Sequence, residues 1–375
     1  MKRIFLFILL LISTGMLSAT DYSSIDRHAA TVPPNMRTAN DIAHYLTKNL
    51  TSPTDKARAI YYWISHAIVY DVAKMYSTET YTDPQELVDK VLKTRRGVCA
   101  NYAALFNACC KSVGVQSYII EGYTRQNYKV VGIAHAWNAI KINGMYYNID
   151  ATWASGYIQG TKYNQKFRDN YFMISPSEFI KTHMPFDPIW QFLNNPVSHK
   201  EFDAGNFSGL KKESNYNYTD SIKVHLGLNP WDKLPRENKR IAAAGLTNAM
   251  IKNKIAQNQQ GITSDIFNKA ADYFNKAVEN YNFYIQCKNR QFDNLSMKDD
   301  KILELLSTTR QSIELADQTL SRINPYDSEL KRTTESLKKS IVAMKRNLDS
   351  EDAFVGKYVK TLKPLRMFLF YKKNE

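Results

Sequence analysis

An Asn-Gly pair at Asn143 and Gly144 constrains the fold of this chain more than any other local feature. The pair separates two runs of β-prone residues, 137–142 and 145–150. A two-residue type I′ turn needs positive φ at both central positions, and Asn followed by Gly meets that need at low cost. The sequence therefore predicts an antiparallel hairpin with this pair at its tip.

The register of the hairpin has a chemical consequence. With a two-residue loop, Ile142 faces Met145. Counting back along both strands places Trp137 opposite Asp150. Side chains alternate faces along a strand, so His135 shares the face of Trp137 and Asp150. His135 and Asp150 are then diagonal neighbours, roughly 7–8 Å apart at Cα, and we expect imidazole and carboxylate to meet.

A cysteine stands at the predicted start of a helix. Apolar residues recur with helical spacing from Cys99 to Gly114, a natural C-cap. A helix N-terminus stabilises a thiolate through its macrodipole and its unpaired N–H groups, and Arg95 and Arg96 precede this one. We therefore expect Cys99 to be a nucleophile, with its own backbone N–H as the first oxyanion donor.

Cysteine, histidine and aspartate are the residue types of a thiol nucleophile, its base and the residue that orients the base. His135 would take the thiol proton and later protonate the leaving amine. Asp150 would accept the other ring N–H and fix the tautomer. No CxxC or HExxH spacing occurs, so we expect no metal and no cofactor.

The other cysteines are expected to be buried structural thiols. They are Cys109, Cys110 and Cys287. The sequence does not set their distances, so it leaves open whether a disulfide forms between them.

Helix and strand signals around these residues predict an α+β domain. Ser52 and Asp83 are N-caps followed by proline, and each precedes an apolar stripe with helical spacing. A strand is expected over 115–123, with a further candidate over 171–174. Helices followed by an antiparallel sheet give an α+β domain, which we expect over 20–200.

Three further segments are expected after this domain. The first is an irregular connector over 201–235 with Asn-Pro turns. Long polar-apolar patterns with turns at Gly261 and Pro325 then predict an antiparallel helical bundle over 236–350. The tail, 351–375, is basic and apolar, and its short apolar run favours docking onto a domain over membrane contact.

The first nineteen residues have the pattern of a secretory signal peptide. Lys2 and Arg3 precede an apolar run from Ile4 to Ile12, and small residues end the segment at Ala19. The run is shorter than the ~20 residues that a membrane-spanning helix needs. We expect cleavage near Ala19 and a secreted or periplasmic protein, with an uncleaved N-terminal anchor as the alternative.

The chain is basic, with a formal charge of +14 at pH 7, of which +9 lies from Gly205 onward. A solvated lysine-rich helical surface is the simplest interpretation, because acids are interspersed throughout. A protein partner or an anionic envelope polymer on the bundle is the alternative. No nucleic-acid partner is expected.

Three motifs together resemble the transglutaminase-like superfamily, especially its bacterial and kyphoscoliosis-peptidase-like branch. The motifs are Arg96 to Ala103, His135 to Asn138 and Asp150 to Trp153. The resemblance covers about residues 40–175. It implies a papain-like transglutaminase core with Cys99 as nucleophile, His135 as base and Asp150 as orienter, acting on a peptide or protein substrate.

The sequence leaves open which residues support the oxyanion and which reaction the protein catalyses. Spacing does not rank the residues that could support the oxyanion or the cleft, which are Trp137, Tyr102, Trp63, Gln85 and Tyr70.

The resemblance is also compatible with three functions. We prefer hydrolysis of peptide or amide bonds through an acyl-thioester on Cys99. The alternatives are acyl transfer from glutamine to an amine, which cross-links proteins, and a non-catalytic envelope binding or assembly module.

Overall fold

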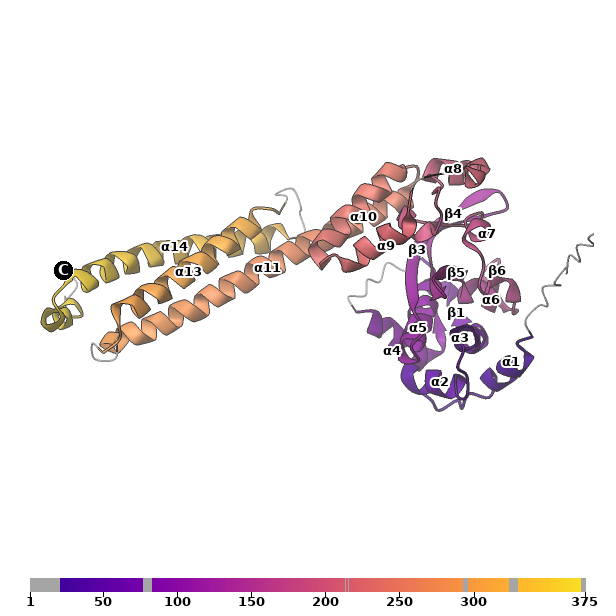
Figure 1. Ribbon diagram of the computed structural model, residues 1–375, viewed down its shortest axis with the longest axis horizontal. Helices are drawn as coiled ribbons and strands as arrows, with labels where there is room; N and C mark the ends of the chain where they lie inside the picture. Colours follow the sequence, from indigo (N-terminus) through magenta and orange to yellow (C-terminus); the bar gives the residue numbers. More distant parts are fainter. Residues whose placement is uncertain are drawn as a thin grey trace, which may run out of the picture. The chain divides into compact units, whose positions relative to one another are not determined.

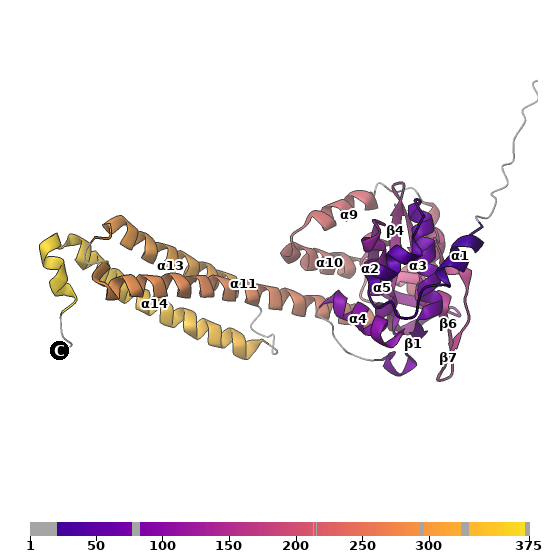
Figure 2. The ribbon, with the colours of Figure 1, turned by 90° about the horizontal axis from the view of Figure 1, so that it is seen from below.

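The computed structural model describes residues 21–76, 83–212, 214, 216–292, 296–323 and 330–371. The expected signal peptide lies outside the described residues. The chain divides into two compact units between Tyr218 and Thr219. The first unit mixes helices with a sheet, and the second is helical (Figures 1 and 2). We had placed the corresponding boundaries at 200 and 236.

Short helices form the first part of the first unit, and their N-caps follow the sequence signals. They are α1 (Ser23–Ala29), α2 (Ala39–Leu46), α3 (Pro53–Ala67), α4 (Pro84–Thr94) and α5 (Cys99–Ser112). The Ser52 side chain accepts a hydrogen bond from the backbone N–H of Asp55, and Asp83 accepts one from Gln85. Both predicted helix starts are therefore confirmed.

A four-stranded antiparallel sheet follows these helices. Its strands are β3 (Ser117–Gln126), β4 (Lys129–Ile142), β5 (Met145–Ile149) and β8 (His183–Pro185), in the order β5-β4-β3-β8. Asn143 and Gly144 have φ of 50° and 84°, and Ile142 pairs with Met145. The hairpin and its register are confirmed, and helices with an antiparallel sheet make the unit α+β as expected.

Smaller elements complete the first unit. They are β1 (Val69–Tyr70), η1 (Val72–Lys74), β2 (Arg96–Gly97), α6 (Ala151–Ser155), β6 (Gly156–Gln159), β7 (Lys162–Gln165), η2 (Asp169–Tyr171), α7 (Pro176–Phe179), η3 (Pro188–Gln191), α8 (His199–Ala204) and η4 (Ser208–Lys211). The strand expected over 171–174 is wrong. Tyr171 is the last residue of η2, and of the other three residues in the segment Ile174 alone makes a β-bridge, to Asn148.

The core of the first unit lies between α3, α5 and the sheet. It joins Ile60 and Ile64 of α3 to Phe106 of α5 and to Ile140 and Ile149 of the hairpin, all fully buried. Burial of such side chains contributes about 1.5–3 kcal/mol each to stability. The helix that begins at Cys99 is therefore fixed against the strands that carry the histidine and the aspartate.

The second unit is built from helices, of which three long ones run side by side (Figures 1 and 2). Its elements are α9 (Tyr218–Gly227), α10 (Pro230–Ala244), α11 (Ala249–Asn289), α13 (Asp299–Leu320), α14 (Lys331–Lys360) and η5 (Lys363–Leu369). Ala277 of α11, Ile313 of α13 and Leu348 of α14 are fully buried between them. The expected helical bundle is present.

Its boundaries differ from our expectation. The irregular connector over 201–235 is wrong, since α9 and α10 lie there: Asn229 is the N-cap of α10 rather than a turn, and its side chain accepts from Asp232 N–H. No turn occurs at Gly261, which lies inside the 41-residue helix α11. Pro325 lies outside the described residues.

The C-terminal tail is also shorter than expected, because α14 continues to Lys360. The segment after it docks on the bundle, as predicted, through Leu369 and Phe370. Among the described residues, no helix combines the length and the apolar character needed to cross a membrane.

Candidate active site

Cys99 occupies the first position of α5, held by side-chain bonds around Val98. The Asn101 Oδ1 atom accepts the Val98 N–H at 3.0 Å, and Asn101 Nδ2 donates to the carbonyl of Leu87 at 3.1 Å. A Cβ on Gly97 would lie 2.6 Å from Asn101 Cβ, so this close packing requires glycine. The sequence from Gly97 to Asn101 thus sets where the Cys99 backbone N–H and thiol lie.

Helix α5, which begins at Cys99, is tied directly to β4, the strand of His135. Asn138 lies on β4 three residues after His135, and its side chain is buried. Its Nδ2 atom donates to the carbonyl of Ala103 on α5 at 3.0 Å. This bond explains why an asparagine stands in the motif His135 to Asn138: it joins α5 to β4 within one turn of Cys99.

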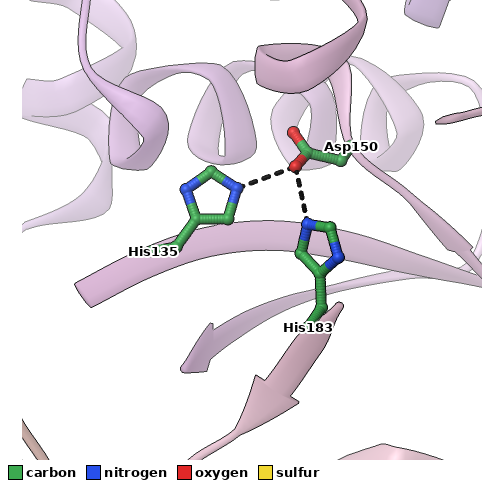
Figure 3. A group of neighbouring side chains, drawn as sticks. All are labelled: His135, Asp150 and His183. Carbon is green, nitrogen blue, oxygen red and sulfur yellow. Dashed lines mark hydrogen bonds and ion pairs between the residues drawn. The ribbon is translucent and has the colours of Figure 1, made fainter. Parts of the chain in front are cut away.

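His135 and Asp150 meet as the register predicted. His135 Nε2 lies 2.7 Å from Asp150 Oδ2 (Figure 3). The β4–β5 ladder ends at the pair Asn138 and Ile149, and Asp150 then becomes the N-cap of α6. Its Oδ1 atom accepts the backbone N–H of Trp153 at 2.9 Å. The carboxylate is fully buried, and both of its oxygens accept hydrogen bonds.

The charges in this group stabilise one another. Burial alone would lower the pKa of His135, but the Asp150 carboxylate and a hydrogen bond with the Cys99 side chain outweigh burial and raise it. Burial would raise the pKa of Asp150, yet the two neighbouring histidines hold it well below its usual range. Since Nε2 of His135 faces Asp150, Nδ1 is the ring nitrogen that can face Cys99. The arrangement favours an imidazolium at His135 paired with the Asp150 carboxylate.

A second histidine, His183 of β8, completes the surroundings of Asp150. Its Nε2 lies 3.1 Å from the same Oδ2 atom (Figure 3). Its Nδ1 lies 2.8 Å from the Thr182 hydroxyl. Burial lowers the pKa of His183 to about 4, so the ring is neutral at pH 7. A neutral ring that donates Nε2–H to Asp150 accepts the Thr182 hydroxyl at Nδ1.

Sequence reasoning missed His183. The hairpin register named His135 as a partner of Asp150 and gave no information on His183. Strand β8 has three residues, and no turn or spacing ties it to Asp150. The available signal was weaker: His183 is a polar residue beside the apolar stretch Met184 to Phe186, where a buried polar side chain needs a partner.

The three ligand-type atoms of His135, Asp150 and His183 lie within 4.8 Å of one another, which is close enough for one metal ion. Both Nε2 atoms, however, contact the same carboxylate oxygen at hydrogen-bond distance. A metal needs the lone pairs of these nitrogens, whereas a short contact with an anionic oxygen needs their protons. The geometry fits a hydrogen-bonded carboxylate better than a metal site.

The expected supporting residues divide by position. Gln85 is exposed and bonds Asp89 on its own helix, so it is not brought to the site. The Tyr102 hydroxyl donates to the carbonyl of Ile68 at 2.7 Å and is committed there. Trp63 packs under the Arg95 guanidinium, 5.2 Å from the ring centroid. None of these three has a side-chain donor that the structure directs at Cys99.

Trp137 and Tyr70 lie closer to the chemistry. The Trp137 ring stacks on His135 with centroids 6.0 Å apart, and its Nε1 atom is buried without a hydrogen-bond partner among the described residues. The pKa of Tyr70 is raised by burial and then by the nearby Cys99 and Asp150. Of the five candidates, Trp137 contacts His135 and Tyr70 lies close enough to Cys99 and Asp150 for their charges to raise its pKa.

All four cysteines are free thiols, and Cys99 is the partly exposed one among them. Burial raises the pKa of Cys109 to about 12 and holds that of Cys110 well above its usual range. Cys287 is buried in α11. The structural role expected for these three thiols agrees with their burial.

Comparison with known proteins gives this geometry a family. Residues 40–151 match the model of the transglutaminase-like superfamily. Kyphoscoliosis peptidase is 31% identical in Mus musculus and 30% identical in Homo sapiens, each over 173 residues, which is 44% of this chain. Hillarin of Drosophila melanogaster is 25% identical over 206 residues, or 49% of this chain. The chain spans about a quarter of the length of these relatives, 26% for both peptidases and 24% for hillarin.

A solved structure described as "Crystal structure of a TGase" aligns with 41% of this chain and 38% of its own, at 16% identity and a TM-score of 0.25. The family model covers the helix that begins at Cys99, the strand of His135 and the turn at Asp150. Over residues 40–151, this chain therefore has a domain of the transglutaminase-like superfamily.

Proposed function

We propose that this protein is an exported cysteine hydrolase that cleaves peptide or amide bonds through an acyl-thioester on Cys99. The observation that carries the proposal is the position of His135, whose ring bonds Asp150 at 2.7 Å and whose pKa is raised by Asp150 and by the Cys99 side chain beside it. A nucleophile, a base and a buried carboxylate that orients the base are the parts of a thiol-hydrolase triad.

The proposed reaction has two halves. The Cys99 thiolate attacks the substrate carbonyl while His135 holds the thiol proton, and the Cys99 backbone N–H stabilises the tetrahedral oxyanion. His135 then gives that proton to the leaving amine, and the C–N bond breaks to leave the acyl-thioester. Water attacks the thioester with His135 as base, which releases the acid and restores the thiol.

Two findings favour hydrolysis by this site over a binding role alone. Cys99, His135 and Asp150 supply the nucleophile, the base and the orienting carboxylate that acyl chemistry needs. Two relatives at 30–31% identity carry the name peptidase. Transglutaminase-like proteins act on protein or peptide substrates, and we propose the same substrate class here.

Alkylation of the thiols tests the nucleophile. Iodoacetamide at pH 6 should modify Cys99 in the full chain and leave Cys109, Cys110 and Cys287 unmodified, because the latter three are buried. Peptide mass spectrometry locates the label. His135→Ala should slow the reaction, whereas Cys287→Ala is the matched control and should not. Equal labelling of all four thiols, or a rate independent of His135, would contradict the proposal.

A second assay separates hydrolysis from acyl transfer. We would incubate the protein with casein and a fluorescent primary amine and compare it with Cys99→Ala. Hydrolysis predicts new casein N-termini without amine incorporation. Incorporation of the amine that requires Cys99 would instead identify an acyltransferase, and neither product would favour a binding module.

Export is part of the proposal and rests on the pattern of the first nineteen residues. Expression of the full gene in a bacterium and N-terminal sequencing of the periplasmic or secreted protein should give a chain that starts near Thr20. A protein retained in the cytosol with Met1 intact would refute export and leave the chemistry of Cys99 untouched.

A further inference from the structure

The short segment after α14 exposes large apolar side chains along one edge. In a 3₁₀-helix, residues three apart eclipse one another. Leu365 and Phe368 of η5 stand in this relation and are 50% and 62% exposed. Leu362, just before η5, and Tyr371, just after it, are also exposed, by 73% and 64%. We call these four residues the apolar edge.

The opposite side of the segment is fixed to the bundle. Arg366 is buried and donates two hydrogen bonds to the carboxylate of Asp299 on α13, at 2.5 and 2.8 Å. Phe370 packs against Phe354 and Tyr358 of α14, with ring centroids 5.5 and 5.9 Å apart. The segment is therefore not a frayed end, and its anchored side holds the apolar edge outward.

Positive charge accompanies the apolar edge. Residues 353–371 contain four basic residues and no acid. Arg366 is paired with Asp299, while Lys357, Lys360 and Lys363 are exposed. Exposed apolar and aromatic side chains flanked by lysine are the composition that binds an anionic bilayer surface, where apolar groups enter the acyl boundary and lysines meet the headgroups.

We propose that the apolar edge and its three lysines form a docking surface for an anionic lipid bilayer. This surface goes beyond the hydrolase function and does not depend on it. A second copy of the chain fits the surface less well, because a symmetric contact would bring the same lysines together. The bilayer is also the partner whose charge and apolar layer both match this surface.

Flotation with lipid vesicles tests the surface in the full mature chain. The protein should float with vesicles of phosphatidylcholine containing phosphatidylglycerol and bind pure phosphatidylcholine far less. Raising the salt to 0.5 M should weaken binding, because headgroup attraction is screened. The double variant Leu365→Ser and Phe368→Ser should lower the partition coefficient by about tenfold or more.

The matched control is Leu315→Ser with Val342→Ser. These residues are apolar and exposed, 37% and 42%, but lie in the middle of α13 and α14. The control should bind like the unaltered chain. Both double variants should keep the melting temperature, because all four side chains are exposed.

Three results would overturn the proposal. One is a chain that does not float with anionic vesicles at low salt. Another is binding that the variant at Leu365 and Phe368 leaves unchanged. The third is self-association that this variant abolishes while vesicle binding is absent, which would make the apolar edge an interface between copies.

Discussion

Asp150 accepts hydrogen bonds from three donors through two oxygens. Oδ1 takes the backbone N–H of Trp153, and Oδ2 takes His135 and His183. A buried carboxylate is costly unless its lone pairs are satisfied, so three donors both stabilise the charge and fix the orientation of the group. His183 is in this sense a positioning residue, because it acts on His135 through Asp150.

Replacing His183 tests this role. His183→Phe keeps the stacking on Phe179 but removes a donor to Asp150. We expect alkylation of Cys99 at pH 6 to slow by about tenfold, since a charge-assisted hydrogen bond contributes about 1.5–3 kcal/mol. His183→Gln can still donate to Asp150 and should restore much of the rate and the pH profile. A Phe variant with the unaltered rate and profile would show that Asp150 needs no second histidine.

At the residue scale, the sequence revealed one of the two histidines. His135 could be joined to Asp150 because the turn at Asn143 and Gly144 fixes a register, and register determines which side chains share a face. His183 reaches the same carboxylate from β8, which pairs with β3 rather than with the hairpin. Contacts between strands that no short turn connects depend on the tertiary fold. No residue spacing in the sequence predicts them.

At the element scale, the bond between Asn138 and Ala103 couples β4 to α5. Asn138→Ala should destabilise the first unit by about 1–3 kcal/mol, because two hydrogen bonds of the buried Asn138 side chain, to the carbonyls of Ala103 and Tyr118, are lost. It should also slow alkylation of Cys99, since α5 loses a tether beside the nucleophile. Ile140→Val on the same strand is the control: urea unfolding should show about 0.5–1.5 kcal/mol lost, with the alkylation rate kept. Equal effects of both variants on alkylation would contradict a tethering role.

The hairpin turn gives a second test at this scale. Gly144 has φ of 84°, and a Cβ added there would meet no atom within 4 Å. Gly144→Ala therefore changes backbone strain alone and should cost about 1–2 kcal/mol in urea unfolding. Gly132→Ala on β4 also meets open space and has no positive φ, so it should cost no stability and should add about 0.4–1 kcal/mol by restricting the unfolded chain. Equal changes in the unfolding free energy of the two variants would show that the positive φ at Gly144 does not strain an alanine there.

Helix N-caps were predicted from the sequence most accurately, and interruptions within helices least accurately. Ser52 and Asp83 start helices because a side-chain oxygen followed by proline suits the first turn. Asn229 followed by Pro230 carries the same signal, but we expected a turn there and so missed the start of α10. Gly261 was read as a break, yet neighbouring apolar contacts in the bundle keep α11 continuous through it. Tertiary packing overrode the local signal there.

For the whole molecule, two buried neutral histidines predict acid sensitivity of the first unit. Burial lowers the pKa of His183 and of His199 to about 4, whereas the unfolded value is near 6.5. Between pH 6.5 and 4 the unfolded chain binds more protons, so stability falls as the pH falls, by about 3 kcal/mol for each histidine. His135, with a raised pKa, keeps its contribution throughout this window.

Urea unfolding at pH 4.5, 5.5 and 6.5 measures this loss. The pH slope of the unfolding free energy should decrease in His183→Gln, because one of the two protonation sites is gone. His225→Gln in the second unit is the comparison and should leave the slope of the first unit unchanged. An identical slope in the unaltered chain and His183→Gln would show that His183 is not protonated on unfolding.

Helix α11 runs for 41 residues without a break. At 1.5 Å per residue its two ends are about 60 Å apart, roughly twice the thickness of the hydrocarbon core of a bilayer. If η5 binds a bilayer, the distance between the bilayer surface and the start of α11 depends on the tilt of the bundle. It can be at most about 60 Å, the length of α11. The helix would then work as a spacer whose length sets how far from a membrane surface the start of the bundle can reach.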